Sequence, residues 1–190
     1  ISKLNLKMIE NIDKPALSAL WPNKKGMSVV LDLGANIECS SKNLFDFSIM
    51  GASLYKSLYP KETPNVALLN IGSEELKGNE TIKETYKILN EKKTDDFNFA
   101  GYIEGNELMS GNVDVIVSDG FTGNVALKTA EGTANFITSE LKKALSDTLI
   151  GKISSLLNIK NLRKFKKRLD PRLYNGAIFI GLDSPVVKSH

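Results

Sequence analysis

The stretch VDVIVSDGFTGN, residues 113–124, decides the fold class of this chain. Its first half, 113–118, is a short β-branched apolar run, which predicts a buried strand. Its second half joins glycine to polar residues and opens a segment of helical apolar spacing, which predicts a long helix over about 124–149. A strand that passes through a short polar loop into a helix is typical of an α/β protein.

The same alternation continues on both sides of this stretch. Further strand-like apolar runs lie at 28–33, 66–71, 97–103 and 177–180. Helical spacing of apolar residues follows the first two runs, at 44–58 and 82–89. Continuous apolar strands separated by helices favour a mostly parallel sheet that is covered on both faces. We therefore expect a single three-layer α/β/α domain over residues 1–190.

Composition narrows the possible chemistry. The 190 residues are 42% apolar and 25% charged, as in a globular domain. One cysteine, Cys39, excludes an internal disulfide, and one histidine, His190, argues against most triad and multi-histidine metal chemistry. No apolar run approaches the roughly 18–20 residues of a membrane-spanning helix, and the first 15 residues lack the pattern of a signal peptide. The chain starts on Ile rather than Met, so we expect a fragment.

Positive charge is concentrated near the C-terminus. Residues 142–172 hold ten Lys or Arg against two Asp, a net charge of +8, so the rest of this +3 chain carries −5. Apolar residues precede the basic cluster, and the pattern predicts a basic amphipathic helical hairpin over 145–172 with an apolar tip. This hairpin is either a solvated face packed on its own body or a contact for an anionic membrane surface or an acidic protein. Nucleic acid is disfavoured because stacking aromatics are scarce. The predicted contact residues are Ile150, Ile153, Leu156, Leu157, Arg163, Lys164, Lys166, Lys167 and Arg168.

Three glycine-and-asparagine loops follow predicted strands, at 34–36, 72–79 and 119–124. Ligands of open parallel sheets bind beyond the carboxyl ends of the strands, where such loops meet. Lys77 adds a positive charge and Asn124 a directed donor, so the pattern predicts a cleft for phosphate or a carboxylate. The alternative is that glycine and asparagine are simply common in such turns. The nucleotide motifs GxxxxGK[ST] and GxGxxG are absent.

Acidic residues and the cysteine have ordinary structural interpretations. Asp32, Asp114 and Asp119 lie near strand ends and could hold Mg²⁺, but no ligand spacing supports a metal, and turn or cap roles are favoured. Cys39 could be a thioester nucleophile, but no histidine lies near it in the sequence, so a passive role is favoured.

Several blocks together carry a family resemblance. They are LDLGANIEC (31–39), FSIMGASLY (47–55), VALLNIGSEELKGNE (66–80), FAGYIEGNEL (99–108), VDVIVSDGFTGNVALKTAEG (113–132) and VVKSH (186–190). In this order they closely resemble the bacterial PlsX phosphate acyltransferase family. That resemblance implies a fold similar to the isocitrate/isopropylmalate dehydrogenases and to phosphotransacetylase, without nicotinamide. It also implies that an N-terminal portion and the extreme C-terminus are missing here.

The resemblance implies a reaction in which phosphate attacks an acyl-[acyl carrier protein], giving acyl phosphate for phospholipid synthesis. It further implies a cytoplasmic homodimer that attaches peripherally to the membrane, with no metal or other cofactor. Lys77 would neutralise the phosphate or the developing oxyanion, and Asn124 would donate a hydrogen bond to the same charge. The residues expected to line the phosphate site are Asn36, Gly72, Ser73, Gly78, Asn79 and Gly123.

Three other functions remain open at this point. A phosphotransacetylase-like enzyme would use the same phosphate chemistry with an acyl-CoA donor. A dehydrogenase of the same fold would need paired acidic metal ligands, which the sequence does not display. A non-catalytic anion- or membrane-binding module would bind vesicles without cleaving thioesters.

Overall fold

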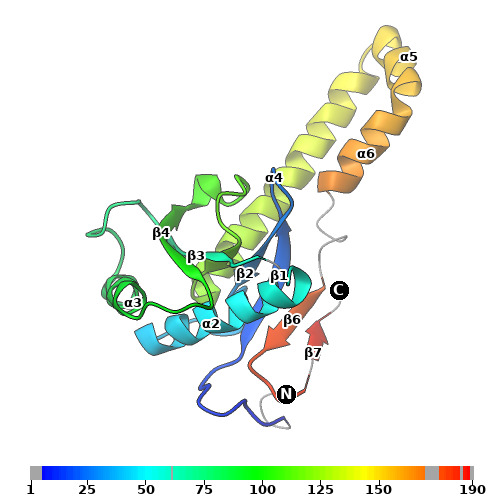
Figure 1. Ribbon diagram of the computed structural model, residues 1–190. Helices are drawn as coiled ribbons and strands as arrows, with labels where there is room; N and C mark the ends of the chain where they lie inside the picture. The colour runs from blue at the N-terminus through cyan, green and yellow to red at the C-terminus, as the bar shows by residue number, and fades with distance from the viewer. Residues whose placement is uncertain (1–5, 61, 170–175, 185, 189–190) are drawn as a thin grey trace.

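The computed structural model describes residues 6–60, 62–169, 176–184 and 186–188. Its centre is a seven-stranded sheet in the order β4-β3-β5-β2-β1-β6-β7 (Figure 1). The strands are β1 (Ala16–Pro22), β2 (Met27–Leu31), β3 (Asn65–Asn70), β4 (Asn98–Glu104), β5 (Val115–Val117), β6 (Ala177–Ile180) and β7 (Val186–Lys188).

Parallel pairing dominates the middle of the sheet. β4, β3, β5 and β2 pair in parallel, whereas β1 is antiparallel to both β2 and β6, and β7 is antiparallel to β6. Five strands therefore point one way and two point the other, which confirms a mostly parallel sheet. β1 was not predicted, and its direction follows from the short turn at 23–26, because a parallel connection needs a crossover of about a dozen residues or more.

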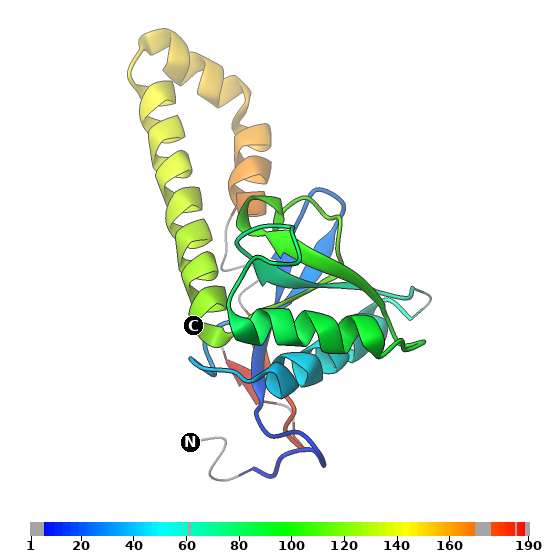
Figure 2. The same cartoon turned by 90° about the vertical axis from the view of Figure 1, so that its left-hand side faces the viewer.

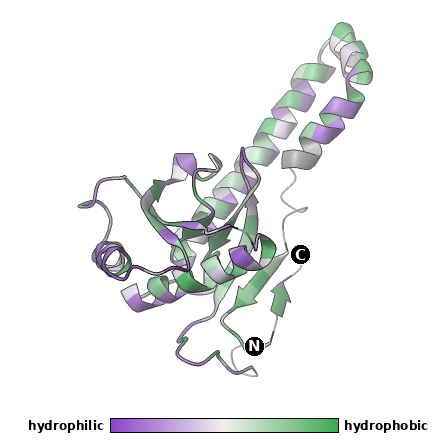
Figure 3. Ribbon diagram, viewed as in Figure 1, coloured by the Kyte–Doolittle hydropathy of each residue, from purple (hydrophilic) through white to green (hydrophobic). Residues whose placement is uncertain are grey.

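Helices lie on both faces of the sheet, but unequally. On one face α2 (Ser41–Leu58) and α3 (Glu80–Glu91) pack against alternate strand residues such as Val115 and Val117. On the other face Ile116 belongs to a second apolar cluster, which the first turns of α4 (Gly120–Ser146) partly cover. Figure 3 shows the apolar colouring of the central strands between these layers.

Side-chain caps set where the helices begin. Ser40 caps α2, with a reciprocal bond from its own backbone N–H to Asn43, and Asp119 caps α4 by accepting the N–H of Thr122. The long helix therefore starts four residues earlier than the predicted Asn124. It ends at Ser146 rather than near Leu149, because Thr148 caps a new helix, α5 (Leu149–Leu157).

α4 carries the chain away from the sheet, and two shorter helices follow it. α5 lies at the far end of α4, and α6 (Ile159–Leu169) runs back from α5 towards the sheet in both views (Figures 1 and 2). α5 and α6 fall within the predicted 145–172 segment, but the outgoing arm is α4 itself. The structure does not describe residues 170–172, His190 or the side chains of Lys166, Lys167 and Arg168.

Candidate active site

Strand register brings the three glycine-and-asparagine loops to one edge of the sheet. Val117 of β5 pairs with Leu31 of β2 on one side and with Leu68 of β3 on the other. Because these strands are parallel, the loops that follow them leave from the same edge of the sheet, with β3 running two residues further, to Asn70. β5 lies between β2 and β3, so the two outer loops start about 10 Å apart.

The loop after β2 is organised around the buried carboxylate of Asp32. Its Oδ1 accepts the backbone N–H groups of Leu17 (3.0 Å), Gly34 (3.2 Å) and Ala35 (2.9 Å). Its Oδ2 accepts the backbone N–H of Asn36 and one N–H of the Asn36 side chain, both at 2.8 Å. The other side-chain N–H of Asn36 is donated to the Pro15 carbonyl at 2.7 Å. The donors of this loop are thus already engaged within the chain.

The start of α4 lies tightly against this loop. The Gly120 N–H donates to the Asn36 carbonyl at 2.7 Å, and a Cβ built on Gly123 would collide with the carbonyl oxygen of Asp32. The side chain of Asp119 accepts the N–H and the hydroxyl of Thr122, at 2.7 and 2.9 Å. Glycine is therefore required at 123 for close approach of helix to strand, and the end of the helix carries its own carboxylate cap.

Asn124 is exposed on the first turn of α4, beside Gly34. A Cβ built on Gly34 would lie 3.5 Å from both Cβ and Cγ of Asn124. Gly34 has φ +122°, a conformation that other residues rarely adopt. The structure thus groups Asn36, Gly123 and Asn124 around the turn that follows β2.

A second group forms in the loop after β3. The Asn70 side chain donates to the carbonyl of Lys77 at 3.1 Å, and Gly78, with φ +94°, lies against the Asn70 amide. The alkyl stem of Lys77 lies over Gly72, since a Cβ built on Gly72 would be 3.0 Å from Lys77 Cγ. The Lys77 ammonium has no hydrogen bond or ion pair within the part of the chain that the structure describes. A free cation is thus held on an ordered loop.

Hydrogen bonds of neighbouring residues connect this loop to α3. Asn79 caps α3 by accepting the N–H of Ile82 at 2.9 Å, so its side-chain oxygen is engaged. The Tyr86 hydroxyl donates to Glu75 Oε1 at 3.0 Å, and burial raises the pKa of that hydroxyl, helped by the bond to Glu75. Ser73 is exposed in the same loop.

These contacts change which groups we expect to bind an anion. The backbone N–H groups after β2 and the Thr122 N–H of α4 are bonded to resident carboxylates, not left open for a ligand. Donors that remain at this edge include the Lys77 ammonium and the Asn124 amide. An incoming anion would accordingly be recognised by groups other than the backbone N–H groups of the turn after β2.

The acidic residues have the turn and cap roles favoured from the sequence. Asp32 and Asp119 act as just described, and Asp114 accepts the backbone and side-chain N–H groups of Asn65 at 2.8 and 3.1 Å. No group of three His, Cys, Asp or Glu that could hold a metal occurs among the described residues. The sequence signal for Asp32 was its place at the end of a predicted strand, two residues before Gly34, but its burial depends on β1.

Cys39 lies half-buried near the same turn. Burial, and secondly the charge of Asp32, raises the pKa of its thiol from 9.0 to about 11. A thiol of that kind is a poor nucleophile at neutral pH. Its environment favours the passive role.

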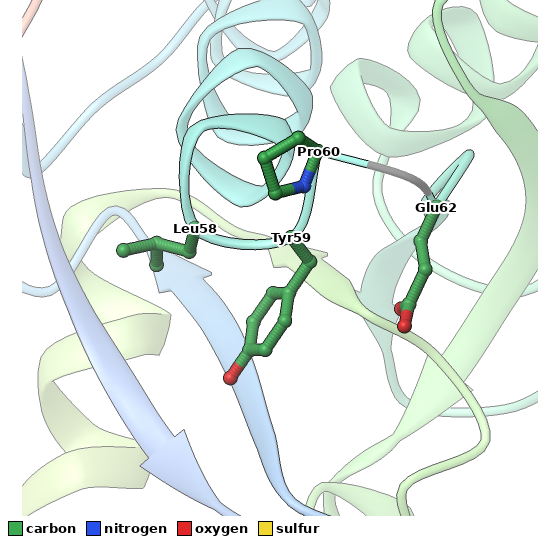
Figure 4. A pocket seen from close by; sticks show the side chains of 4 residues that line it. All are labelled: Leu58, Tyr59, Pro60 and Glu62. Carbon is green, nitrogen blue, oxygen red and sulfur yellow. The ribbon is translucent and has the colours of Figure 1, made fainter.

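A separate depression of about 300 Å³ lies at the opposite edge, near the start of β3. Leu58, Tyr59, Pro60 and Glu62 line it at the end of α2 (Figure 4). None of the predicted site residues takes part in it.

The far helices expose apolar side chains. Ile150 and Leu157 of α5 are 81% and 82% exposed, and Leu149, Ile153 and Leu156 are also exposed. Arg163 and Lys164 are exposed on α6. None of the helices among the described residues combines the length and apolarity needed to span a bilayer.

Comparison with known proteins shows extensive similarity. The family model described as "Fatty acid synthesis protein" matches residues 1–190. The phosphate acyltransferase of Pelagibacter ubique (strain HTCC1062) is 82% identical over 190 residues, which are all of this chain and 57% of that relative. The phosphate acyltransferase of Maricaulis maris (strain MCS10) is 45% identical over 191 residues, with 54% of its length covered. The chain thus spans little more than half of these relatives.

Solved structures support the fold. The EutD phosphotransacetylase from Staphylococcus aureus aligns with 70% of this chain and 46% of its own, at a TM-score of 0.56 and 15% identity. A phosphotransacetylase from Streptococcus pyogenes aligns with 67% and 44%, at 0.54 and 15%. At such identity the likeness concerns the fold alone. Because the family model matches this chain from end to end, the protein belongs to the fatty acid synthesis protein family, alongside relatives named phosphate acyltransferase.

Proposed function

We propose that the complete protein is a phosphate acyltransferase that makes acyl phosphate from acyl-[acyl carrier protein] and inorganic phosphate for phospholipid synthesis. The observation that carries the proposal is the match of the whole chain, at 82% identity, to a relative named phosphate acyltransferase. The common edge of the three loops supports it, because a dianion and a thioester must meet at one place.

The reaction needs positioning and charge stabilisation more than a covalent intermediate. An oxygen of HPO₄²⁻ attacks the thioester carbonyl carbon, and the carbonyl oxygen becomes an oxyanion. The C–S bond then breaks, the acyl group leaves as acyl phosphate, and the phosphate proton passes to the released thiolate. Lys77 would neutralise the phosphate or the oxyanion, and Asn124 would donate to the same charge.

The geometry supports a role for each of the other predicted site residues. Gly72, Ser73 and Gly78 would shape the pocket beside Lys77, and Gly123 would let α4 approach. Asn36 would contribute chiefly by holding its loop, since its side-chain N–H groups are engaged in the bonds described above. Asn79 caps α3 through its side-chain oxygen, so its side-chain N–H groups would remain to donate to phosphate.

The decisive assay follows acyl phosphate formation by the complete protein from long-chain acyl-[acyl carrier protein], with and without phosphate. Phosphate-dependent loss of thioester with equal release of carrier thiol is expected. No phosphate-dependent product would leave a non-catalytic anion- or membrane-binding module as the better description.

A phosphotransacetylase-like activity on acyl-CoA is the second candidate, since it would use the same attack of phosphate on a thioester. Parallel assays with acyl-[acyl carrier protein] and the CoA thioester of the same chain separate the two. A higher kcat/KM for the CoA donor would reverse our assignment.

We also propose the finer features that the resemblance implies. The complete protein would have the three-layer isocitrate/isopropylmalate dehydrogenase-like fold, form a homodimer and lie in the cytoplasm against the membrane. The 145–172 segment would act as a basic amphipathic hairpin. Its apolar side chains would enter the bilayer interface, and its basic residues, with Lys166, Lys167 and Arg168, would attract lipid headgroups or the acidic carrier protein.

A further inference from the structure

We propose that Asp32 is a positioning residue for the reaction, acting through Asn124 by fixing the turn against which Asn124 lies. This inference rests on the proposed function. It concerns a residue that touches neither phosphate nor thioester.

The Asp32 carboxylate is fully buried and accepts five hydrogen bonds, four from backbone N–H groups. A buried carboxylate is stable only when its oxygens are so satisfied, and removing such a partner leaves buried donors unpaired. Three of the donors are consecutive, from Gly34 to Asn36, so the backbone of the turn wraps around the two oxygens. The fourth backbone donor, Leu17, belongs to β1.

This arrangement connects three elements that are separate in the sequence. The carboxylate joins β1 to the turn after β2, and the Leu33 N–H returns a bond to the Leu17 carbonyl at 2.9 Å. The same turn accepts the Gly120 N–H through the Asn36 carbonyl. The backbone of Asp32 also bonds Ser118, with its N–H donating to the Ser118 carbonyl at 2.9 Å.

Asn124 lies beside this turn. Its Cβ and Cγ lie beside Gly34, whose N–H is one of the five donors to Asp32. Gly123, the residue before it, lies against the Asp32 carbonyl. A shift of the turn would therefore move the surface beside which the Asn124 side chain lies, and displacements of about 1 Å at a reacting centre cost roughly 10²-fold in rate.

The test uses the complete protein and two matched variants, Asp32→Asn and Asp114→Asn. Each variant removes a carboxylate that accepts both the backbone and a side-chain N–H of one asparagine, Asn36 for Asp32 and Asn65 for Asp114. Asp114, however, lies at the opposite ends of the parallel strands. We expect Asp32→Asn to lower kcat by about 10- to 100-fold with little change in KM for phosphate. Asp114→Asn should lower thermal stability and leave kcat near that of the wild type. Equal kcat for the two variants would overturn the proposal.

A double-mutant cycle with Asn124→Ala tests the route of the effect. If Asp32 acts through Asn124, Asp32→Asn should cost little further kcat once Asn124 is alanine. If the kcat of the double variant is instead lowered by the product of the two single reductions, Asp32 acts independently of Asn124 and the proposal is overturned. An inactive wild-type protein would instead remove the proposed function itself.

Should Asp32→Asn fail to fold, Asn36→Ala decides the matter, because it removes one donor and keeps the carboxylate with its four backbone bonds. A lower kcat that is non-additive with Asn124→Ala supports the proposal. A raised KM for phosphate with unchanged kcat would make Asn36 a direct ligand and would overturn it.

Discussion

At the scale of single residues, charge is distributed unevenly over the candidate site. Two carboxylates, Asp32 and Asp119, are tied into backbone N–H groups, whereas the Lys77 ammonium has no partner among the described residues. A cation without a counter-ion among the described residues, on a loop at the same edge of the sheet, is suited to binding an anion from outside. We therefore predict that phosphate recognition by the complete protein depends most on Lys77.

Replacing Lys77 with methionine keeps the alkyl stem over Gly72 and removes the charge. We expect kcat/KM for phosphate to fall by roughly 10²- to 10³-fold in the complete protein, as for the loss of one transition-state donor. Lys83→Met is the matched control, because Lys83 lies near this loop on α3 but forms an exposed ion pair with Glu80, 3.0 Å long. Similar rates for both variants would exclude the role given to Lys77.

The raised pKa of the Cys39 thiol predicts how its alkylation rate depends on pH. With a pKa of about 11 instead of 9.0, its thiolate fraction at pH 8 is roughly 100-fold below that of an ordinary thiol. Iodoacetamide should therefore label Cys39 slowly at pH 8, and the rate should increase tenfold per pH unit up to about pH 11. Mass spectrometry measures the labelling, and Cys39→Ala should keep acyl phosphate formation. A plateau in labelling below pH 9 would contradict the raised pKa.

At the scale of elements, the junction of β2 with α4 is the tightest part of the site. Gly123 faces the carbonyl of Asp32 and the hydroxyl oxygen of Ser118, which would be 2.7 Å from an added Cβ. The helix cannot begin at this place with a larger residue unless it moves away from the strand. The position of Asn124 is set by the same contact.

Gly123→Ala should accordingly destabilise the protein by about 1–3 kcal/mol or more, because the added methyl meets backbone that cannot rotate away. The matched control is Gly132→Ala in the same helix, where nothing lies within 4 Å of the added Cβ. That change should stabilise by about 0.5–1 kcal/mol through helix propensity. Urea denaturation of both variants measures the difference, and an equally stable Gly123→Ala would contradict the close contact.

At the scale of the whole molecule, helix α5 lies far from the sheet, at the end of α4 (Figures 1 and 2), and its apolar side chains are exposed. Their exposure in a helix next to the exposed Arg163 and Lys164 is the pattern of an interfacial contact. The loops of the candidate site lie at the sheet instead. Membrane contact and chemistry would thus be separable by mutation.

Ile150→Asp should weaken binding of the complete protein to phosphatidylglycerol-containing vesicles by about tenfold or more, since a buried isoleucine is worth roughly 1.5–3 kcal/mol. Ile9→Asp, which changes an exposed isoleucine near β6, is the control. Arg163→Glu with Lys164→Glu should weaken binding mainly at low salt. Cosedimentation measures all three, and unchanged binding of Ile150→Asp would exclude α5 as the contact.

The sequence by itself determined the alternation of strands and helices, the loops at the strand ends and the family. Those features depend on local physics: apolar spacing, and caps such as Ser40, Asn79 and Asp119 that bond within three residues. For that reason the ends of strands β2 to β6 and of helices α2 and α3 fell within three residues of their predictions, whereas β1 and β7 were not predicted and α4 begins four residues earlier than expected.

Only the tertiary structure decided the pairing of β1 with β6, the enclosure of Asp32 and the occupation of the donors in the turn after β2. Each depends on groups distant in the sequence, such as the Leu17 N–H on Asp32 and the Gly120 N–H on Asn36. Glycine and asparagine in a loop indicate that a backbone can approach an anion. Whether the anion is a ligand or the chain's own carboxylate is settled by which strand lies beside the loop, and no local pattern contains that information.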